Sequence, residues 1–147
     1  MAGHGGSAGD GEAVVLYDAD CGWCRWSLAK ILAWDRDRRV RAVALQDAEA
    51  DALLAGMAPA ERMASWHLVT AEGRRHSGGA ALAPLLRLFP GGPPVARCAE
   101  AVPGLTDRGY RWIAEHRTLF VRSLRGSWIE RADGRIRERS APRSQRI

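Results

Sequence analysis

Short apolar runs separated by turn-forming residues indicate a chain that mixes strands and helices. Three of these runs are predicted to be strands, at residues 13–17, 40–45 and 66–70. The first two have almost no polar face, which is typical of strands covered on both sides. Between them, apolar residues recur at helical spacing from Cys24 to Leu32. We expect this helix to end near Asp35, where a cluster of charges interrupts the apolar face.

Capping and turn residues divide the middle of the chain. Asp47 is a candidate N-cap for a short helix that stops at Gly56. Residues 57–64, which contain a proline, are expected to be a linker. Gly73 lies in a turn after the third predicted strand, and residues 75–77 are expected to pair back as a hairpin.

Proline and glycine residues separate the helices of the C-terminal part. We expect an apolar helix at residues 80–89, followed by a break at the Pro- and Gly-rich stretch 90–94. A short helix is predicted over residues 95–102. Thr106 is a candidate N-cap for a longer helix that continues towards Leu124.

The predicted order of elements is strand–helix–strand–helix–strand–strand–helix, followed by extra helices. A β-α-β half places two parallel strands side by side, because its helix returns the chain to the same end of the sheet, and a β-β-α half adds a hairpin. This β-α-β-α-β-β-α core is the α/β arrangement of thioredoxins and glutaredoxins. The pattern therefore predicts a thioredoxin-like fold with extra C-terminal helices.

Length and charge limit the number of domains and the kinds of binding partner that the chain can have. Its 147 residues suffice for one domain with a substantial core, which we expect to span residues 13–125 after a flexible, Gly-rich leader at residues 1–12. Residues 126–147 contain six arginines and three acidic residues, and we expect them to form a basic, disordered tail. The net charge is +5, but no zinc-finger spacing or basic patch interleaved with aromatic residues favours nucleic-acid binding.

The sequence contains no candidate membrane span or secretory signal. No apolar run approaches the roughly 18 residues that a span requires, and the N-terminal residues lack the apolar segment of a signal peptide. We therefore expect a cytoplasmic protein that does not span the membrane. In that compartment a Cys-x-x-Cys pair is more often catalytic or metal-binding than a structural disulfide.

The most informative feature is the pair Cys21 and Cys24, which follows the first predicted strand. At the start of a helix, unpaired backbone N–H groups and the helix dipole favour thiolate over thiol, and the thiolate is the nucleophile. We expect Cys21 to attack a disulfide and Cys24, one turn further along, to resolve the mixed disulfide. Gly22 is expected to let substrate backbone approach, and Trp23 to offer an apolar contact.

Two carboxylates precede the sulfurs. The charge of Asp20, next to Cys21, is expected to oppose thiolate formation. Asp18 either relays a proton to or from the dithiol or caps the turn by accepting backbone N–H bonds, and the capping role is favoured.

Two other interpretations of the cysteine pair stay open, an inert buried pair and a structural zinc site. Zinc requires four ligands, and the remaining candidates are Cys98, His4, His67, His76 and His116. A zinc site of three cysteines and one histidine is the more specific of these two alternatives, although no spacing of ligands in the sequence indicates it. We expect Cys98 to be buried in a helix and His67 to be packed or to lie on an edge strand, with no cofactor or metal bound.

The opening motif from Tyr17 to Cys24 resembles that of the DCC family of thiol-disulfide oxidoreductases, also called DUF393. The family signature is Asp-x-x-Cys-x-x-Cys, here Asp18, Cys21 and Cys24. Later segments are also similar to the family: the strand 66–69, Gly73, Gly79 with Ala80, Pro103, and the helix from Tyr110 to Arg117. The resemblance covers about residues 13–122.

The resemblance implies a thioredoxin-like fold and dithiol–disulfide exchange with a disulfide-bearing protein or a small thiol. The chain departs from the family at Ala19, where glycine is usual; a positive φ there would strain alanine. It also lacks the proline that thioredoxins place before the third strand, since residues 63–66 are Met-Ala-Ser-Trp. Two hypotheses follow: a thiol-disulfide oxidoreductase, or a non-enzymatic thioredoxin-like binding module whose dithiol is regulatory or holds zinc.

Overall fold

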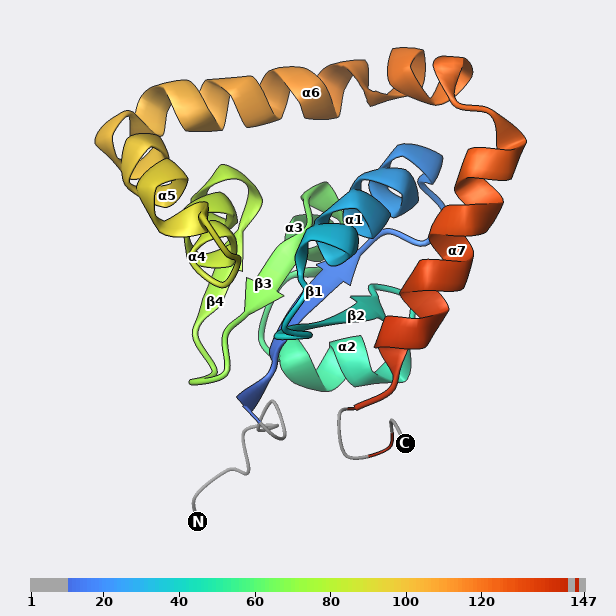
Figure 1. Ribbon diagram of the computed structural model, residues 1–147, viewed down its shortest axis with the longest axis horizontal. Coiled ribbons are helices and arrows are strands. Elements are labelled where there is room, and N and C mark those ends of the chain that lie inside the picture. Colours follow the sequence, from blue (N-terminus) through green and yellow to red (C-terminus); the bar gives the residue numbers. More distant parts are fainter. Residues whose placement is uncertain (1–10, 143–144, 146–147) are drawn as a thin grey trace.

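Four strands form one mixed sheet at the centre of the structure, a computed structural model that describes residues 11–142 and 145 (Figure 1). The strands are β1 (Ala13–Tyr17), β2 (Val40–Ala44), β3 (His67–Val69) and β4 (Arg75–Ser77). Their order is β2-β1-β3-β4, with β1 parallel to β2, β1 antiparallel to β3, and β3 antiparallel to β4. The predicted β-α-β half and hairpin are thereby confirmed, and the mixed α/β architecture is compatible with a thioredoxin-like fold.

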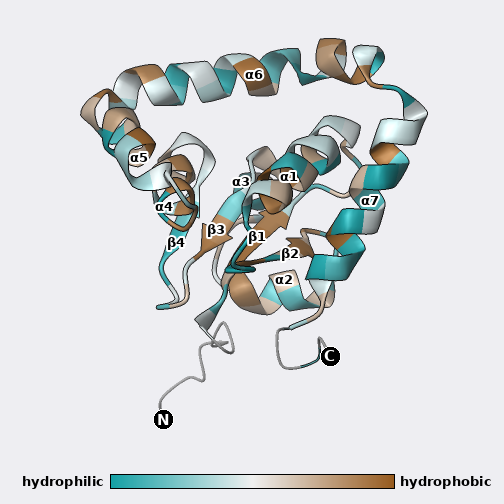
Figure 2. Cartoon of the chain, viewed as in Figure 1, coloured by the Kyte–Doolittle hydropathy of each residue, from teal (hydrophilic) through white to brown (hydrophobic). Residues whose placement is uncertain are grey.

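Strand β1 is buried because helices cover both faces of the sheet around it. Alternate side chains of a strand point to opposite faces. Val15 packs with Leu28 and Leu85 on one face, whereas Leu16 packs with Leu53 on the other. Figure 2 shows β1, β2 and β3 mainly in the colour of apolar residues. The apolar runs of the sequence thus form the core.

Helices pack on both faces of the sheet, and one long helix crosses the end of the molecule. In chain order they are α1 (Gly22–Trp34), α2 (Ala48–Leu53), α3 (Pro59–Ala64), a 3-10 helix (Gly78–Ala81), α4 (Leu82–Leu86), α5 (Gly92–Ala101), α6 (Pro103–Ser123) and α7 (Gly126–Ser140). Helices α1, α4 and α7 pack on one face, and α2 packs on the other. Helix α6 connects α5 with α7 and lies across the end of α1 (Figure 1).

The structure corrects several predicted boundaries. Residues 57–64, expected to be a linker, contain α3, whose first residue is Pro59. Proline is well tolerated there because the first N–H of a helix has no intrahelical partner. Helix α6 begins at Pro103, so Thr106 is not its N-cap. Instead, the Thr106 hydroxyl donates to the carbonyl of Ala99 (3.0 Å) and ties α6 to α5.

The largest correction concerns residues 126–147, which we expected to be a disordered tail. Residues 126–140 form α7, which packs along α1. Its buried residues are Ala132, Ile136 and Arg139. Arg139 forms an ion pair with Asp35 (Nη1–Oδ2, 2.7 Å), and the two side chains are only 9% and 1% exposed. A helix that looks polar in the sequence is therefore held by a buried charge pair as well as by apolar contacts.

Both ends of the chain lie partly outside the described residues. This applies to residues 1–10 of the predicted leader and to residues 143–144 and 146–147 of the predicted tail. Glu12, which we assigned to the flexible leader, is buried at the start of β1. The ordered domain therefore begins before residue 13 and continues past residue 125.

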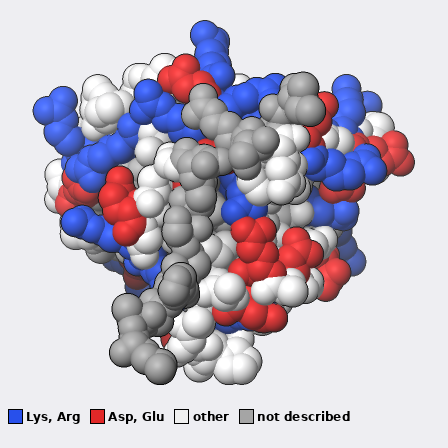
Figure 3. Space-filling model, turned by 90° about the horizontal axis from the view of Figure 1, so that it is seen from below, with Lys and Arg blue, Asp and Glu red and all other residues white. Residues whose placement is uncertain are grey.

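The described surface carries both signs of charge. On the face seen from below, basic and acidic side chains are interspersed among the described residues (Figure 3). This mixed pattern does not favour a nucleic acid as the partner of that face. None of the helices that the structure describes is long and apolar enough to cross a membrane.

Candidate active site

The carboxyl end of β1 leads directly into the turn that carries the cysteines. Asp18 Oδ1 accepts hydrogen bonds from the Asp20 N–H (2.9 Å) and from Gln46 Nε2 (2.8 Å). The Cys21 N–H donates to the Asp18 carbonyl (3.3 Å). Asp18 therefore makes the turn-capping contact that the sequence favoured.

Gln46, just after β2, holds the same turn from the neighbouring strand. Besides its bond to Asp18, its Oε1 accepts from the Ala19 N–H (3.2 Å). The parallel register of β1 and β2 brings the two strand ends together, and sequence reasoning did not find this residue because its role depends on that register. Ala19 does not have a positive φ, so alanine in place of the usual glycine is unstrained.

Cys21 is the N-cap of α1, and its sulfur accepts a hydrogen bond from the Cys24 N–H (3.2 Å). A hydrogen bond from the Cys24 side chain, this backbone bond and the charge of Arg117 lower the pKa of Cys21 to about 6. Burial and the charge of Asp18 oppose the shift. The opposing carboxylate is thus Asp18, whereas we expected Asp20. At neutral pH the Cys21 sulfur is a thiolate, the form that attacks disulfides.

Cys24 is the complementary member of the pair. Its hydrogen bond to Cys21, its burial and the charge on Cys21 raise the pKa of Cys24 far above the ordinary value for a thiol. Cys24 therefore keeps its proton while Cys21 is a thiolate. The fold therefore favours opposite protonation states for the two sulfurs.

Helix α6 brings two polar side chains to the dithiol, Tyr110 and Arg117. Burial raises the pKa of Tyr110, whose hydroxyl is hydrogen-bonded by the Trp66 backbone and the Ser65 side chain. Gly78, at φ +57°, leaves room for the Tyr110 ring, because a Cβ there would lie 3.2 Å from Tyr110 Cε1. The segment before β3, where thioredoxins carry a proline, is thus braced by Tyr110.

Gly22 is placed differently from what we expected, and Trp23 makes a contact within the fold that the sequence did not indicate. A Cβ at Gly22 would lie 3.4 Å from Ile129 Cδ1 and 3.8 Å from Val121 Cγ1, so this side of Gly22 faces the junction of α6 and α7 and not an open approach for substrate. The Trp23 ring stacks on Phe120, with ring centroids 4.8 Å apart. Trp23 therefore helps to fix α6 over α1.

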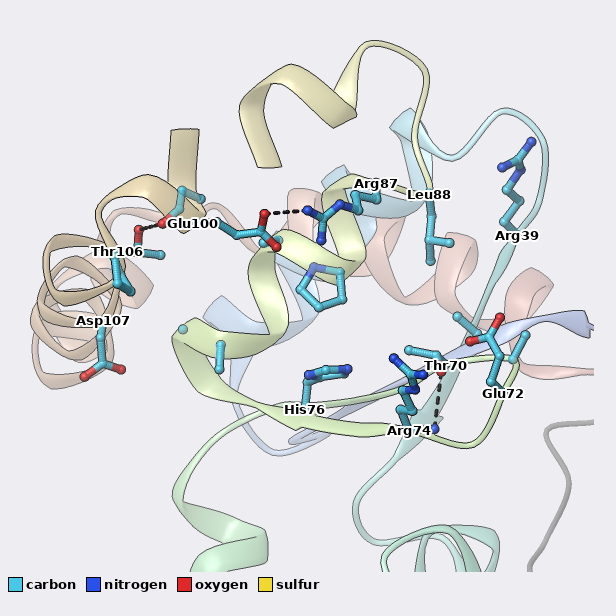
Figure 4. Close-up of a pocket in the computed structure, with 18 of the residues that line it drawn as sticks. Arg39, Thr70, Glu72, Arg74, His76, Arg87, Leu88, Glu100, Thr106 and Asp107 are labelled. Carbon is cyan, nitrogen blue, oxygen red and sulfur yellow. Dashed lines mark hydrogen bonds and ion pairs between the residues drawn. The ribbon is translucent and has the colours of Figure 1, made fainter. Parts of the chain in front are cut away.

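A pocket of about 260 Å³ lies beside Cys24, between α1, the segment before β3, and α6. Cys24, Trp23, Tyr110 and Arg117 are among the residues that line it. A larger hollow of about 880 Å³ lies by β4, α4 and α5 (Figure 4). No cysteine lines it, and its charged groups are of both signs, with Arg87 ion-paired to Glu100. The smaller pocket is therefore the one connected with the dithiol.

The remaining candidate residues do not join the site. Cys98 is exposed on α5, which corrects the prediction that it is buried. His67 is buried and packed as predicted, with Nε2 2.8 Å from the Arg62 carbonyl and Nδ1 2.7 Å from Ser77 Oγ. Within the described part of the chain, no three His, Cys, Asp or Glu side chains are grouped to hold a metal ion.

Replacing Arg117 by Gln should raise the pKa of Cys21, because a nearby positive charge is removed while the hydrogen bonds from Cys24 are kept. The increase should be smaller than that caused by Cys24→Ala, which removes the main cause of the shift. The pH dependence of Cys21 alkylation measures both. Arg111→Gln is the matched control, since Arg111 pairs with Asp107 elsewhere on α6. An increase as large in Arg111→Gln would contradict the assignment.

The comparisons with known proteins agree with this geometry. A family model described as DCC1-like thiol-disulfide oxidoreductase matches residues 15–123, a span that includes both cysteines of the pair, Tyr110 and Arg117. No curated protein and no solved structure matches the chain.

Proposed function

The chain belongs to the family of DCC1-like thiol-disulfide oxidoreductases, and we propose that Cys21 and Cys24 carry out its thiol–disulfide exchange. The partner is a disulfide-bearing protein or a small disulfide. The observation that carries this proposal is the opposite effect of the fold on the two thiols, since the pKa of Cys21 is lowered to about 6 and that of Cys24 is raised.

The reaction has two displacement steps. The Cys21 thiolate attacks one sulfur of the substrate disulfide; the substrate S–S bond breaks, and the first substrate sulfur leaves as a thiolate that takes a proton from solvent. Cys24 then loses its proton to solvent and attacks Cys21 Sγ; the S–S bond between Cys21 and the substrate breaks, and the second substrate sulfur leaves as a thiolate that takes a proton from solvent. The products are a Cys21–Cys24 disulfide and a substrate dithiol that has gained two electrons. A cytoplasmic thiol reductant restores the pair.

The coupling between the two sulfurs gives the steps their order. The proton of Cys24 is held partly by the hydrogen bond to the Cys21 thiolate and by its charge. When Cys21 enters the mixed disulfide, that charge disappears and both effects end. The pKa of Cys24 therefore falls once it is needed as the second nucleophile.

The surrounding residues support the reaction in two ways: they hold the turn before Cys21, and they place a positive charge near its sulfur. Asp18 and Gln46 keep Cys21 at the N-cap of α1 by holding the turn before it. Asp20 borders the turn, and Arg117 contributes a positive charge that favours the thiolate. Trp23 and Gly22 seat α6 and α7 against the start of α1.

A trapping experiment tests the proposal. In Cys24→Ser the first step proceeds but resolution stops, so incubation with a disulfide-bearing peptide should leave a stable peptide adduct on Cys21, detected by mass spectrometry of proteolytic fragments. The double variant Cys24→Ser with Cys98→Ser should trap equally well, because Cys98 lies outside the site. An adduct confined to Cys98, or none at all, would overturn the proposed mechanism.

A further inference from the structure

The pocket beside Cys24 is apolar over most of its wall. Its deep part is formed by the buried side chains of Val15 and Leu28, together with Gly79. Ile31, Trp66, Leu82 and Ala114 add further apolar surface. An apolar group that enters a space lined in this way gains free energy by leaving water.

The lining of the pocket includes one of the two redox residues, Cys24. Met63 and Ile113 are 47% and 40% exposed and belong to the lining, so they mark the entrance. The Cys24 sulfur is hydrogen-bonded to Cys21 and lies in the wall. Because Cys24 lines the pocket and is hydrogen-bonded to Cys21, a disulfide that Cys21 attacks lies beside this pocket.

We propose that this pocket receives an apolar side chain of a peptide or protein substrate, from the residue next to the cysteine that Cys21 attacks. The proposal rests on the function proposed above and names its substrate class. The volume of about 260 Å³ suits a single large aliphatic or aromatic side chain. It lies below the usual range of about 300–1,000 Å³ for small-molecule sites.

The charged residues of the lining bear on the kind of occupant. The charged residues of the lining, Asp18 and Arg117, are of opposite sign, so the pocket as a whole does not select a charged group.

The consequence is selectivity between substrates with equal disulfide chemistry. Burying a leucine side chain contributes roughly 1.5–3 kcal/mol relative to leaving it exposed. A serine side chain gains almost no free energy in the same space, because its hydroxyl loses its hydrogen bonds to water. A disulfide flanked by leucine should therefore be reduced faster than one flanked by serine, on the order of tenfold.

Two blocked peptides, each a symmetric disulfide dimer, test the proposal with the full-length protein. In one peptide both neighbours of the cysteine are Leu, and in the other both are Ser. The ratio of their kcat/KM values should be about ten in favour of the Leu peptide. Ile113→Glu, which places a charge at the mouth, should bring the ratio close to one. Leu119→Glu is the matched control, because Leu119 is 60% exposed on the same helix and outside the pocket. It should keep the full ratio.

The outcomes separate this proposal from the function on which it rests. Equal rates for the two peptides in the unchanged protein would overturn the pocket proposal while leaving disulfide exchange intact. A ratio that survives Ile113→Glu, or one that Leu119→Glu lowers as much, would overturn it as well. If neither peptide nor hydroxyethyl disulfide is reduced, it is the proposed function that fails. Ile113 is partly exposed, so Ile113→Glu is compatible with folding, and its thermal unfolding is compared with that of Leu119→Glu.

Discussion

Replacing Arg139 by Met should lower the free energy of unfolding by about 3–5 kcal/mol, because the change leaves the buried carboxylate of Asp35 without its counter-charge. Arg139 Nη1 lies 2.7 Å from Asp35 Oδ2, and its Nη2 donates to the carbonyls of Asp35 (2.8 Å) and Leu32 (3.3 Å). One side chain thus joins α7 to the last turn of α1. Urea unfolding monitored by circular dichroism measures the loss.

The same helix supplies the control for this prediction. Arg137 is exposed on α7, so Arg137→Met should change the free energy of unfolding by no more than about 0.5 kcal/mol. If Arg139→Met behaves like Arg137→Met, the buried ion pair does not hold α7 in place. If Arg139→Met is much less stable than Arg137→Met, residues after 125 unfold together with the rest of the domain.

The reduced protein should show a Cys21 that is reactive in mildly acidic solution. At pH 6 about half of Cys21 is thiolate, against less than about 1% of an ordinary thiol with a pKa near 8.5. A thiolate of lower pKa is intrinsically less nucleophilic, which offsets part of this gain. Alkylation of Cys21 by iodoacetamide should therefore be about tenfold faster than that of a free cysteine peptide at pH 6, and no faster at pH 9.

The same lowered pKa affects stability. The folded state favours the thiolate, so the contribution of Cys21 to stability is present at high pH and is lost as the pH falls through about 6. The reduced protein should gain stability relative to Cys21→Ser as the pH rises from 6 towards the ordinary thiol range. Thermal unfolding of both proteins at several pH values measures this. A constant difference would contradict the assigned shift.

The apolar pattern was sufficient to predict the sheet and the first helix. The runs at residues 13–17 and 40–45, in which Arg41 is the only charged residue, contain the buried strands β1 and β2; helices cover both faces of such strands, so they need no polar side. The helical spacing of apolar residues after Cys24 predicted α1, because the residues at that spacing, Leu28 and Leu32, face the core. The position of the cysteines at the junction followed from these two elements alone.

Helix α7 could not be predicted in the same way because its burial depends on a distant partner. Its fully buried apolar residues are only Ala132 and Ile136, which is little for a segment rich in arginine. The contact that fixes it joins Arg139 to Asp35, residues far apart in the sequence. Figure 2 shows α7 mainly in the colour of polar residues, which is why composition suggested a disordered tail.

The wider site depends on packing that no local pattern contains. Helical spacing predicted α6, and the family resemblance singled out the helix from Tyr110 to Arg117. This helix lies over the dithiol because it approaches Gly78 and Gly79 closely. A Cβ at Gly78 would lie 3.2 Å from Tyr110, and a Cβ at Gly79 would lie 3.1 Å from Asp107. Cys98 was placed wrongly because α5 buries only Gly92 and Ala96.

The central claim is that Cys21 is a stabilised thiolate that initiates disulfide exchange, and the most direct measurement is its pKa in the reduced, full-length protein. The rate of alkylation at Cys21, followed by mass spectrometry from pH 4 to pH 10, gives that value without interference from Cys24 or Cys98. The account predicts a single rise with its midpoint at about 6. A midpoint at or above the ordinary thiol value of about 8.5 would contradict it and favour a binding module in which the dithiol is not a catalyst.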